Sequence, residues 1–211
     1  MDTLKGICSS KIIAIARGIY GDELTEASRA LYAGGVRAFE VTFEQNEPLV
    51  RTADAIVRLT ESLPSDAVIG AGTVLTSEQV DAAHFAGARF IISPDTDPNV
   101  IGRTKELSMV SIPGAMTPTE IVSAYSFGAD IVKVFPAGVL GIEYFKAVKA
   151  PLKHIPLAAV AGVTVSNIKA FYEAGAVAFG ISSSLYLRDA IKNGEYQLIT
   201  QAAEAFYSAI K

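Results

Sequence analysis

Short apolar runs alternate with longer segments of helical periodicity along all 211 residues, and this alternation most constrains the fold. It is typical of βα units that build a parallel sheet. Eight strands are predicted, near residues 12–17, 38–43, 67–73, 90–94, 109–114, 131–136, 156–162 and 178–183. Amphipathic helices are predicted over 22–33, 76–86, 117–127 and 164–174, and a last helix over about 197–211.

Capping residues and glycines mark the ends of these helices. The predicted N-caps are Asp22, Thr76, Thr117 and Thr164. A glycine closes each of the four helices and precedes the next strand by a few residues, at Gly34-Gly35, Gly87, Gly128 and Gly175.

Eight βα units in so short a chain favour a single (β/α)₈ TIM barrel, with residues 1–211 forming one domain. The alternative is an open doubly wound sheet, which usually carries a G-x-G-x-x-G turn after its first strand. Here the first strand ends in Ala16-Arg17-Gly18-Ile19-Tyr20-Gly21, which lacks that spacing. The barrel is therefore favoured.

Composition excludes several kinds of partner. The net charge is −4, from 18 basic and 22 acidic residues without a basic block, so neither nucleic acid nor an anionic membrane is an expected partner. The apolar runs are too short to span a bilayer, and the N-terminus lacks a hydrophobic signal core, which predicts a cytoplasmic protein. The single cysteine, Cys8, excludes an internal disulfide and is expected to be a small, at least half-buried residue.

Lys133 is the most informative single residue, because it interrupts the apolar strand Ile131-Val132-Lys133-Val134-Phe135. Burying an ammonium group is costly, and burial lowers the amine pKa from its ordinary value near ~10.4 toward neutrality. A neutral lysine can form a Schiff base with a carbonyl substrate. The alternatives are a lysine that extends from an edge strand to solvent, or one paired with a buried carboxylate for structural reasons.

Glu40 supplies a candidate acid/base beside this lysine. Strand alternation places Glu40 and Thr42 on one side, and Phe39, Val41 and Phe43 on the other. A carboxylate in a low-dielectric site next to a lysine can transfer protons near neutral pH. The competing interpretation is a structural Glu40–Lys133 ion pair, which would contribute little to stability.

Other polar residues gather at the C-terminal ends of the strands, where the active sites of such barrels lie. Arg17 could bind a substrate carboxylate or phosphate, or could be an exposed rim charge. Thr73 follows Gly70-Ala71-Gly72, whose glycines allow a ligand to approach the backbone or serve barrel packing. Gly162 and Ser182–Ser184 occupy the usual phosphate position of barrels.

Histidine and cysteine chemistry is not expected at this end. His84 falls inside a predicted helix, and His154 falls in the loop entering the seventh strand, at the opposite end of the barrel. A zinc mechanism would then lack ligands and a serine triad would lack its base. The chemistry is therefore expected to need neither metal nor cofactor.

Five motifs together resemble the KDPG/KHG aldolase family, the 2-keto-3-deoxy-6-phosphogluconate and 4-hydroxy-2-oxoglutarate aldolases. They are Glu40-Val41-Thr42, Gly70-Ala71-Gly72-Thr73, Ile92-Ser93-Pro94, Pro113-Gly114-Ala115-Met116-Thr117-Pro118-Thr119-Glu120 and Lys133-Val134-Phe135-Pro136. The resemblance runs from about residue 10 to 187. It implies a homotrimeric (β/α)₈ barrel and a metal-free aldolase that releases pyruvate through a lysine Schiff base.

The resemblance also implies roles by position. Lys133 would be the Schiff-base lysine and Glu40 the acid/base. The remaining implied roles are carboxylate binding by Arg17 and Thr73, pocket shaping by Pro94 and Phe135, and phosphate binding by Gly162 and Ser183.

Three departures from the family pattern concern the substrate's tail. Val160-Ala161-Gly162 stands where many members have Thr-Gly-Gly, Ser182 stands at a frequent glycine position, and Glu44 replaces an arginine found in some members. The galactonate-type branch shares the valine but keeps both glycines.

The expected function is reversible cleavage of a 2-keto-3-deoxy sugar acid to pyruvate and an aldehyde by a class I aldolase. The substrate would be 6-phosphorylated (KDPG, or its galactonate isomer KDPGal) or would be 4-hydroxy-2-oxoglutarate. Two alternatives stay open at this point: a phosphosugar isomerase or epimerase without a covalent intermediate, and a non-catalytic barrel that binds a sugar acid.

Overall fold

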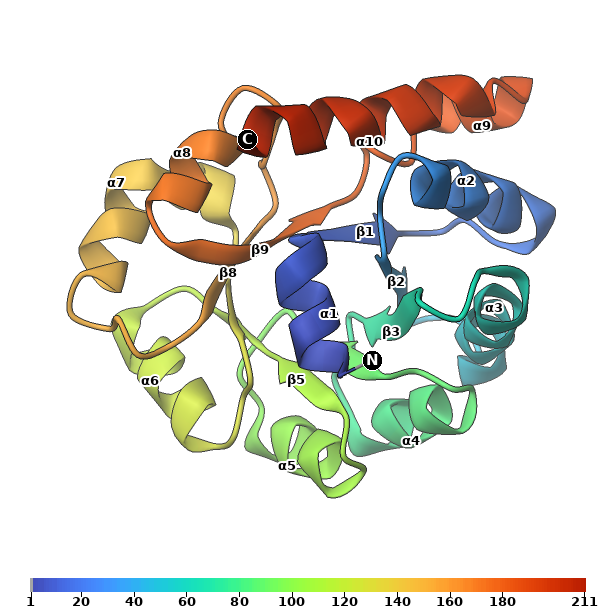
Figure 1. The fold of residues 1–211 in the computed structure, drawn as a ribbon. Helices are drawn as coiled ribbons and strands as arrows, with labels where there is room; N and C mark the ends of the chain where they lie inside the picture. The colour runs from blue at the N-terminus through green and yellow to red at the C-terminus, as the bar shows by residue number, and fades with distance from the viewer. Residues whose placement is uncertain (1) are drawn as a thin grey trace.

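The computed structural model describes residues 2–211, which form a closed ring of parallel strands surrounded by helices (Figure 1). The strands are β1 (Ile12–Ala16), β2 (Ala38–Thr42), β3 (Val68–Gly72), β4 (Phe90–Ile92), β5 (Val110–Ile112), β6 (Gly114–Ala115), β7 (Val132–Val134), β8 (Leu157–Val160) and β9 (Ala176–Ile181). The helices are α1 (Thr3–Ser10), α2 (Gly21–Ala33), α3 (Leu49–Ser62), α4 (Ser77–Phe85), α5 (Pro98–Glu106), α6 (Pro118–Ser126), α7 (Ala137–Lys149), α8 (Ile168–Glu173), α9 (Arg188–Asn193) and α10 (Tyr196–Ile210).

The ring closes at Pro113, which divides the predicted fifth strand into β5 and β6. β5 pairs with β4, whereas β6 pairs with β7. Proline has no backbone N–H to donate, but its carbonyl remains an acceptor. The Pro113 carbonyl accepts a hydrogen bond from the Lys133 amide at 2.8 Å, and this bond joins the two sides. Counting β5 and β6 as one strand gives the eight predicted strands, so the (β/α)₈ barrel is confirmed.

Helix α1 lies across the N-terminal end of the barrel, a feature that the sequence analysis did not anticipate (Figure 1). Ile7 of α1 is fully buried against the barrel interior, with inward-facing side chains such as Ile13, Phe90 and Ile131. Cys8 is half-buried against the same cluster, as predicted. The interior is therefore filled and covered at this end.

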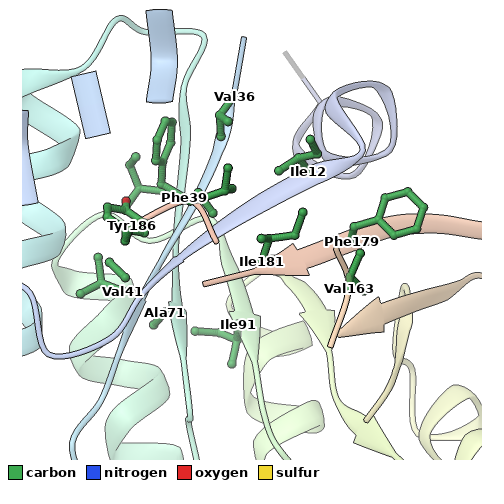
Figure 2. Packing of buried hydrophobic residues seen from close by; sticks show 14 of the residues in the cluster. Ile12, Val36, Phe39, Val41, Ala71, Ile91, Val163, Phe179, Ile181 and Tyr186 are labelled. Atoms are coloured by element: carbon green, nitrogen blue, oxygen red, sulfur yellow. The ribbon is translucent and has the colours of Figure 1, made fainter. Parts of the chain in front are cut away.

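The outer faces of the strands form a second core beneath the helices (Figure 2). Phe39 and Val41 of β2 lie in it, whereas Glu40 between them points into the barrel. This is the alternation predicted for the strand. The Tyr186 hydroxyl lies 2.8 Å from Ser28 Oγ and ties the segment after β9 to α2. The apolar outer face fixes each strand, so the orientation of its inward side chains is fixed as well.

Two of the four predicted N-caps are confirmed. The Thr76 side chain caps α4, and Thr117 forms a reciprocal capping box with Glu120 at the start of α6. The glycines predicted at the helix ends are also in place, with left-handed φ at Gly35, Gly87, Gly128 and Gly175.

The other two cap predictions are wrong. Helix α2 begins at Gly21, so Asp22 lies inside its first turn, where a negative charge favours the helix dipole. Helix α8 begins only at Ile168, because Thr164 enters a turn in which its amide donates to Asn167 Oδ1 at 2.8 Å. Within residues 2–211, no helix combines the length and apolar character needed to cross a bilayer.

Candidate active site

A pocket of about 640 Å³ opens at the C-terminal ends of the strands. All eight residues that the sequence analysis assigned to the site line it: Arg17, Glu40, Thr73, Pro94, Lys133, Phe135, Gly162 and Ser183. They come from seven different strands or the loops that follow them, so only the closed barrel brings them together.

Lys133 and Glu40 enter this pocket from opposite sides of the ring. Lys133 lies in β7, in register with Gly114 and Ala158, and it is 6% exposed. Glu40 lies in β2 and is 3% exposed. Glu40 Oε2 is buried and has no hydrogen-bond partner among the described residues. An unpaired buried carboxyl oxygen is costly, and a site that binds a polar substrate is one reason to keep it.

Two glycines of β3 make room for the side chains beside them. A Cβ on Gly72 would lie 1.6 Å from Glu40 Oε1, and a Cβ on Gly70 would lie 2.5 Å from the Phe90 ring. Both distances are far below van der Waals contact. The glycine pair therefore serves packing, and through Gly72 it also provides the space in which the Glu40 carboxyl lies.

Burial shifts the pKa values of both groups toward neutrality. Burial lowers the pKa of Lys133 to about 8, although the charge of Glu40 opposes this shift. Burial raises the pKa of Glu40 to about 7, against the opposing effects of Lys133 and then Arg17. The Lys133 ammonium lies 4.8 Å from the centroid of the Phe135 ring. Near neutral pH, both groups are thus close to the point where they gain or lose a proton.

A structural ion pair does not account for this arrangement. The ion pairs formed among residues 2–211 all lie outside the pocket, and neither Glu40 nor Lys133 belongs to one. A lysine that extends from an edge strand is excluded as well, because β7 is hydrogen-bonded on both sides.

Arg17 and Thr73 form a second polar group at the pocket wall. Arg17 Nη2 donates to Thr73 Oγ1 at 3.2 Å. The Arg17 carbonyl accepts a hydrogen bond from Arg188 Nη2 at 2.5 Å, which anchors the β1–α2 loop to the start of α9. Among the described residues that line the pocket, Arg17 and Lys133 carry the cationic side chains. Arg17 is thus available to bind an anionic group.

The opposite end of the pocket is formed by the loops after β8 and β9. Ala161 and Gly162 both have left-handed backbones, with φ of 69° and 76°. Gly162 packs against Gly138 at the start of α7, where a Cβ would lie 2.7 Å from the Gly162 Cα. Ser182 Oγ donates to the Ile15 carbonyl at 2.9 Å, so this hydroxyl is engaged within the protein. Ser183 and Ser184 are exposed to the pocket.

Several residues that line the pocket were not predicted from the sequence. Thr164 was assigned to a helix cap, and Ile15, Val163, Gly180 and Ile181 were not singled out. Ile15 and Gly180 could have been found by strand alternation, because they lie on inward faces two residues before Arg17 and Ser182. No comparable signal marks Thr164.

Both histidines lie where they were expected, away from the pocket. His84 lies in α4. His154 lies in the segment before β8, where its ring packs edge-on against the Tyr125 ring. Within residues 2–211, no group of three or more His, Cys, Asp or Glu side chains is arranged to hold a metal ion.

Comparison with known proteins gives one consistent result. The sequence model of the family described as KDPG and KHG aldolase matches residues 5–202. A probable 2-dehydro-3-deoxy-6-phosphogalactonate aldolase of Rhizobium meliloti is 36% identical over 200 residues, which cover 94% of this chain and 92% of that protein. The 2-dehydro-3-deoxy-6-phosphogalactonate aldolase of Escherichia coli K12 is 38% identical over 176 residues, 83% of this chain and 84% of the other.

A solved structure agrees with these relatives. The crystal structure of KDPG aldolase from Legionella pneumophila, with pyruvate captured at low pH as a covalent carbinolamine intermediate, superposes with a TM-score of 0.84. The two proteins are 27% identical, and the match covers 98% of each chain.

Proposed function

This chain belongs to the KDPG and KHG aldolase family, and from that premise we propose the substrate and the role of each residue in its pocket. The protein is a class I aldolase that cleaves a 2-keto-3-deoxy acid to pyruvate and an aldehyde. The substrate proposed first is 2-keto-3-deoxy-6-phosphogalactonate. The support is that the two relatives at 36% and 38% identity carry that specificity in their names, whereas a KHG/KDPG aldolase of Escherichia coli is 31% identical.

Lys133 is the proposed nucleophile. Its neutral amine adds to the C2 carbonyl to give a carbinolamine, and loss of water gives a protonated imine. Arg17 and Thr73 bind the C1 carboxylate, which holds C2 over the amine. Pro94 and Phe135 enclose the pyruvyl part of the substrate.

Glu40 is the proposed proton carrier. Its carboxylate removes the proton from the C4 hydroxyl, the C3–C4 bond breaks, and the electron pair moves into the imine to leave an enamine while the aldehyde departs. Glu40 then returns a proton to C3, and hydrolysis of the new imine releases pyruvate and restores the Lys133 amine. Gly162 and Ser183 bind the phosphate at the far end of the substrate.

The observation that carries this mechanism is the pair of buried groups with pKa values of about 8 and about 7 in one pocket. An epimerase that works by proton transfer needs no buried amine, and a barrel that only binds a sugar acid needs neither group. Desolvating both groups is costly, and the aldol mechanism uses both.

We also propose that the reaction needs no metal, that residues 1–211 act as one domain, and that the protein is a cytoplasmic homotrimer. The proposal that no metal is needed rests on the protonated imine at Lys133, which accepts the electron pair of the broken C3–C4 bond and so takes the place of a Lewis acid. Activity should survive dialysis against a strong chelator, and light scattering should give three times the chain mass of 22.2 kDa.

The test is cleavage of synthetic KDPG, KDPGal and 4-hydroxy-2-oxoglutarate, with the released pyruvate measured by a coupled dehydrogenase. Lys133→Ala should abolish turnover, whereas Lys169→Ala, a control at an exposed lysine of α8, should leave it unchanged. Wild-type rates in Lys133→Ala would refute the mechanism. Equal rates with both phosphorylated substrates would refute the galactonate assignment alone.

A further inference from the structure

A chain of amide hydrogen bonds runs from helix α4 to the pocket wall, through two glutamines that do not line the pocket. Gln79 Nε2 donates to Gln45 Oε1 at 3.0 Å, and Gln45 Nε2 donates to the Thr73 carbonyl at 2.8 Å. We infer that Gln45 and Gln79 are positioning residues, which hold Thr73 and through it Arg17 in the geometry that binds the substrate carboxylate. The inference rests on the proposed function.

Gln79 is the fixed end of this chain. Its side chain is 6% exposed, and its Oε1 accepts the Leu75 amide at 2.7 Å. The backbone amide of Gln79 donates to Oγ1 of the capping residue Thr76. Because Oε1 is held by a backbone donor, the NH₂ group of Gln79 must face away from Leu75 and toward Gln45.

The orientation of Gln79 determines that of Gln45. The NH₂ group of Gln79 requires an acceptor, so Gln45 presents its oxygen to Gln79 and its own NH₂ to the Thr73 carbonyl. Gln45 is exposed in the loop between β2 and α3, and its side chain gains a single orientation only through these two bonds. Two polar links thus connect a rigid helix end to Thr73.

Thr73 is a residue that needs such support. Its φ is 56°, a left-handed conformation that is unfavourable for a β-branched residue. The bond from Gln45 holds its carbonyl, and the amide of the next residue, Val74, donates to the Ile92 carbonyl at 3.2 Å. With the backbone held, the Thr73 hydroxyl accepts from Arg17 at 3.2 Å. An exposed arginine otherwise samples many rotamers, and fixing them contributes to binding.

Capping of α4 alone does not explain this arrangement. The bonds of Gln79 to Leu75 and Thr76 would satisfy that role without Gln45. Gln45 caps no helix, because α3 begins four residues later at Leu49. The two hydrogen bonds of the Gln45 side chain therefore act on Thr73.

The test measures trapping of carbonyl compounds on Lys133 by borohydride, with the adduct quantified by intact mass. Pyruvate carries the carboxylate, and hydroxyacetone is a ketone of the same chain length without it. Gln45→Met and Gln79→Leu should each raise the half-saturating pyruvate concentration about three- to tenfold, the effect of losing one ordered hydrogen bond. Half-saturation by hydroxyacetone should stay unchanged, because it makes no carboxylate contact.

Two control variants separate positioning from folding. Asn46→Met makes a similar substitution at the next exposed position of the same loop. Thr76→Ala weakens the cap of α4 but leaves both glutamines in place. Neither control should change half-saturation by pyruvate. Thr76→Ala could raise the half-saturating pyruvate concentration as much as Gln79→Leu does, or the half-saturating hydroxyacetone concentration could rise in parallel with that of pyruvate. Either result would show that the role is structural and would refute the inference.

The result also distinguishes this inference from the proposed function. Absence of any Lys133 adduct in the wild-type protein would refute both. Normal wild-type trapping with unchanged half-saturation in Gln45→Met and Gln79→Leu would refute the positioning role alone.

Discussion

Two ionisable residues that line the pocket, Lys133 and Glu40, are buried. Each lies on the inward face of a strand, and burial moves the two pKa values to within about one unit of each other. Each residue opposes the shift that burial causes in the pKa of the other, because the charge of each favours the charged form of its partner. This balance between burial and mutual attraction lets Lys133 and Glu40 exchange protons near neutral pH, as the proposed nucleophile and base require.

This balance predicts the pH dependence of Schiff-base formation. The neutral form of Lys133 attacks, so the rate should rise with pH through about 8. The negative charge of Glu40 raises the Lys133 pKa, so Glu40→Gln should lower that pKa and move the midpoint to lower pH. The measurement is the initial rate of pyruvate trapping across pH 5–10. An unchanged or higher midpoint would contradict the electrostatic account.

Burial of Lys133 should also cost stability. Its folded-state pKa lies below the ordinary value of 10.5, so the unfolded chain takes up the proton first as the pH falls from 10.5 to about 8. The free energy of unfolding therefore decreases as the pH falls through that window. Lys133→Met should therefore raise the free energy of unfolding at pH 7 by on the order of 1–2 kcal/mol, a gain that shrinks as the pH rises toward 10. Urea unfolding at several pH values checks this, and a destabilised variant at pH 7 would count against it.

At the scale of elements, the site depends on which strand faces point inward. β2 and β7 each present one ionisable residue to the interior, and β3 lies beside β2 with no side chain at the facing positions, Gly70 and Gly72. The absence of a Cβ is as necessary as the carboxyl group, because the Glu40 carboxyl occupies the space that a side chain at position 72 would need.

Gly72→Ala should therefore disable the proton steps without touching Lys133. The added Cβ would displace the Glu40 carboxyl, and turnover should fall by about 10²–10⁴-fold, as expected for loss of a general acid/base. Pyruvate trapping on Lys133 should persist. Gly102→Ala is the matched control, because a Cβ there meets nothing within 4 Å. Turnover within twofold of wild type in Gly72→Ala would show that Glu40 is not held in this space.

In the whole molecule, the two ends of the barrel have different roles. Helix α1 and the interior apolar layer close the N-terminal end, while the pocket opens at the other. The strands could be predicted from apolar periodicity, and six of the eight predicted pocket residues from their places in or just after strands, because both signals are local. The pocket roles of Pro94 and Phe135 were predicted only through the resemblance to the aldolase family. The cover by α1 could not, since an eight-residue helix with one buried large side chain, Ile7, has too little periodicity.

Other features depended on contacts between distant segments. The division of the fifth strand at Pro113 follows from barrel closure, which brings β6 beside β7. The Gln45–Gln79 link joins residues 34 positions apart, and neither residue type suggests such a partner. Thr164 resembles a helix cap in sequence, but in the structure it lines the pocket, and its backbone amide donates to Asn167 Oδ1.

The proposed mechanism requires that Lys133 form a Schiff base with pyruvate. This can be measured by borohydride reduction in the presence of pyruvate, followed by peptide mass spectrometry. We expect one stable adduct per chain, on the peptide that contains Lys133, and none in Lys133→Ala. An adduct on another lysine, or none when pyruvate is shown by calorimetry to be bound, would contradict the proposed mechanism.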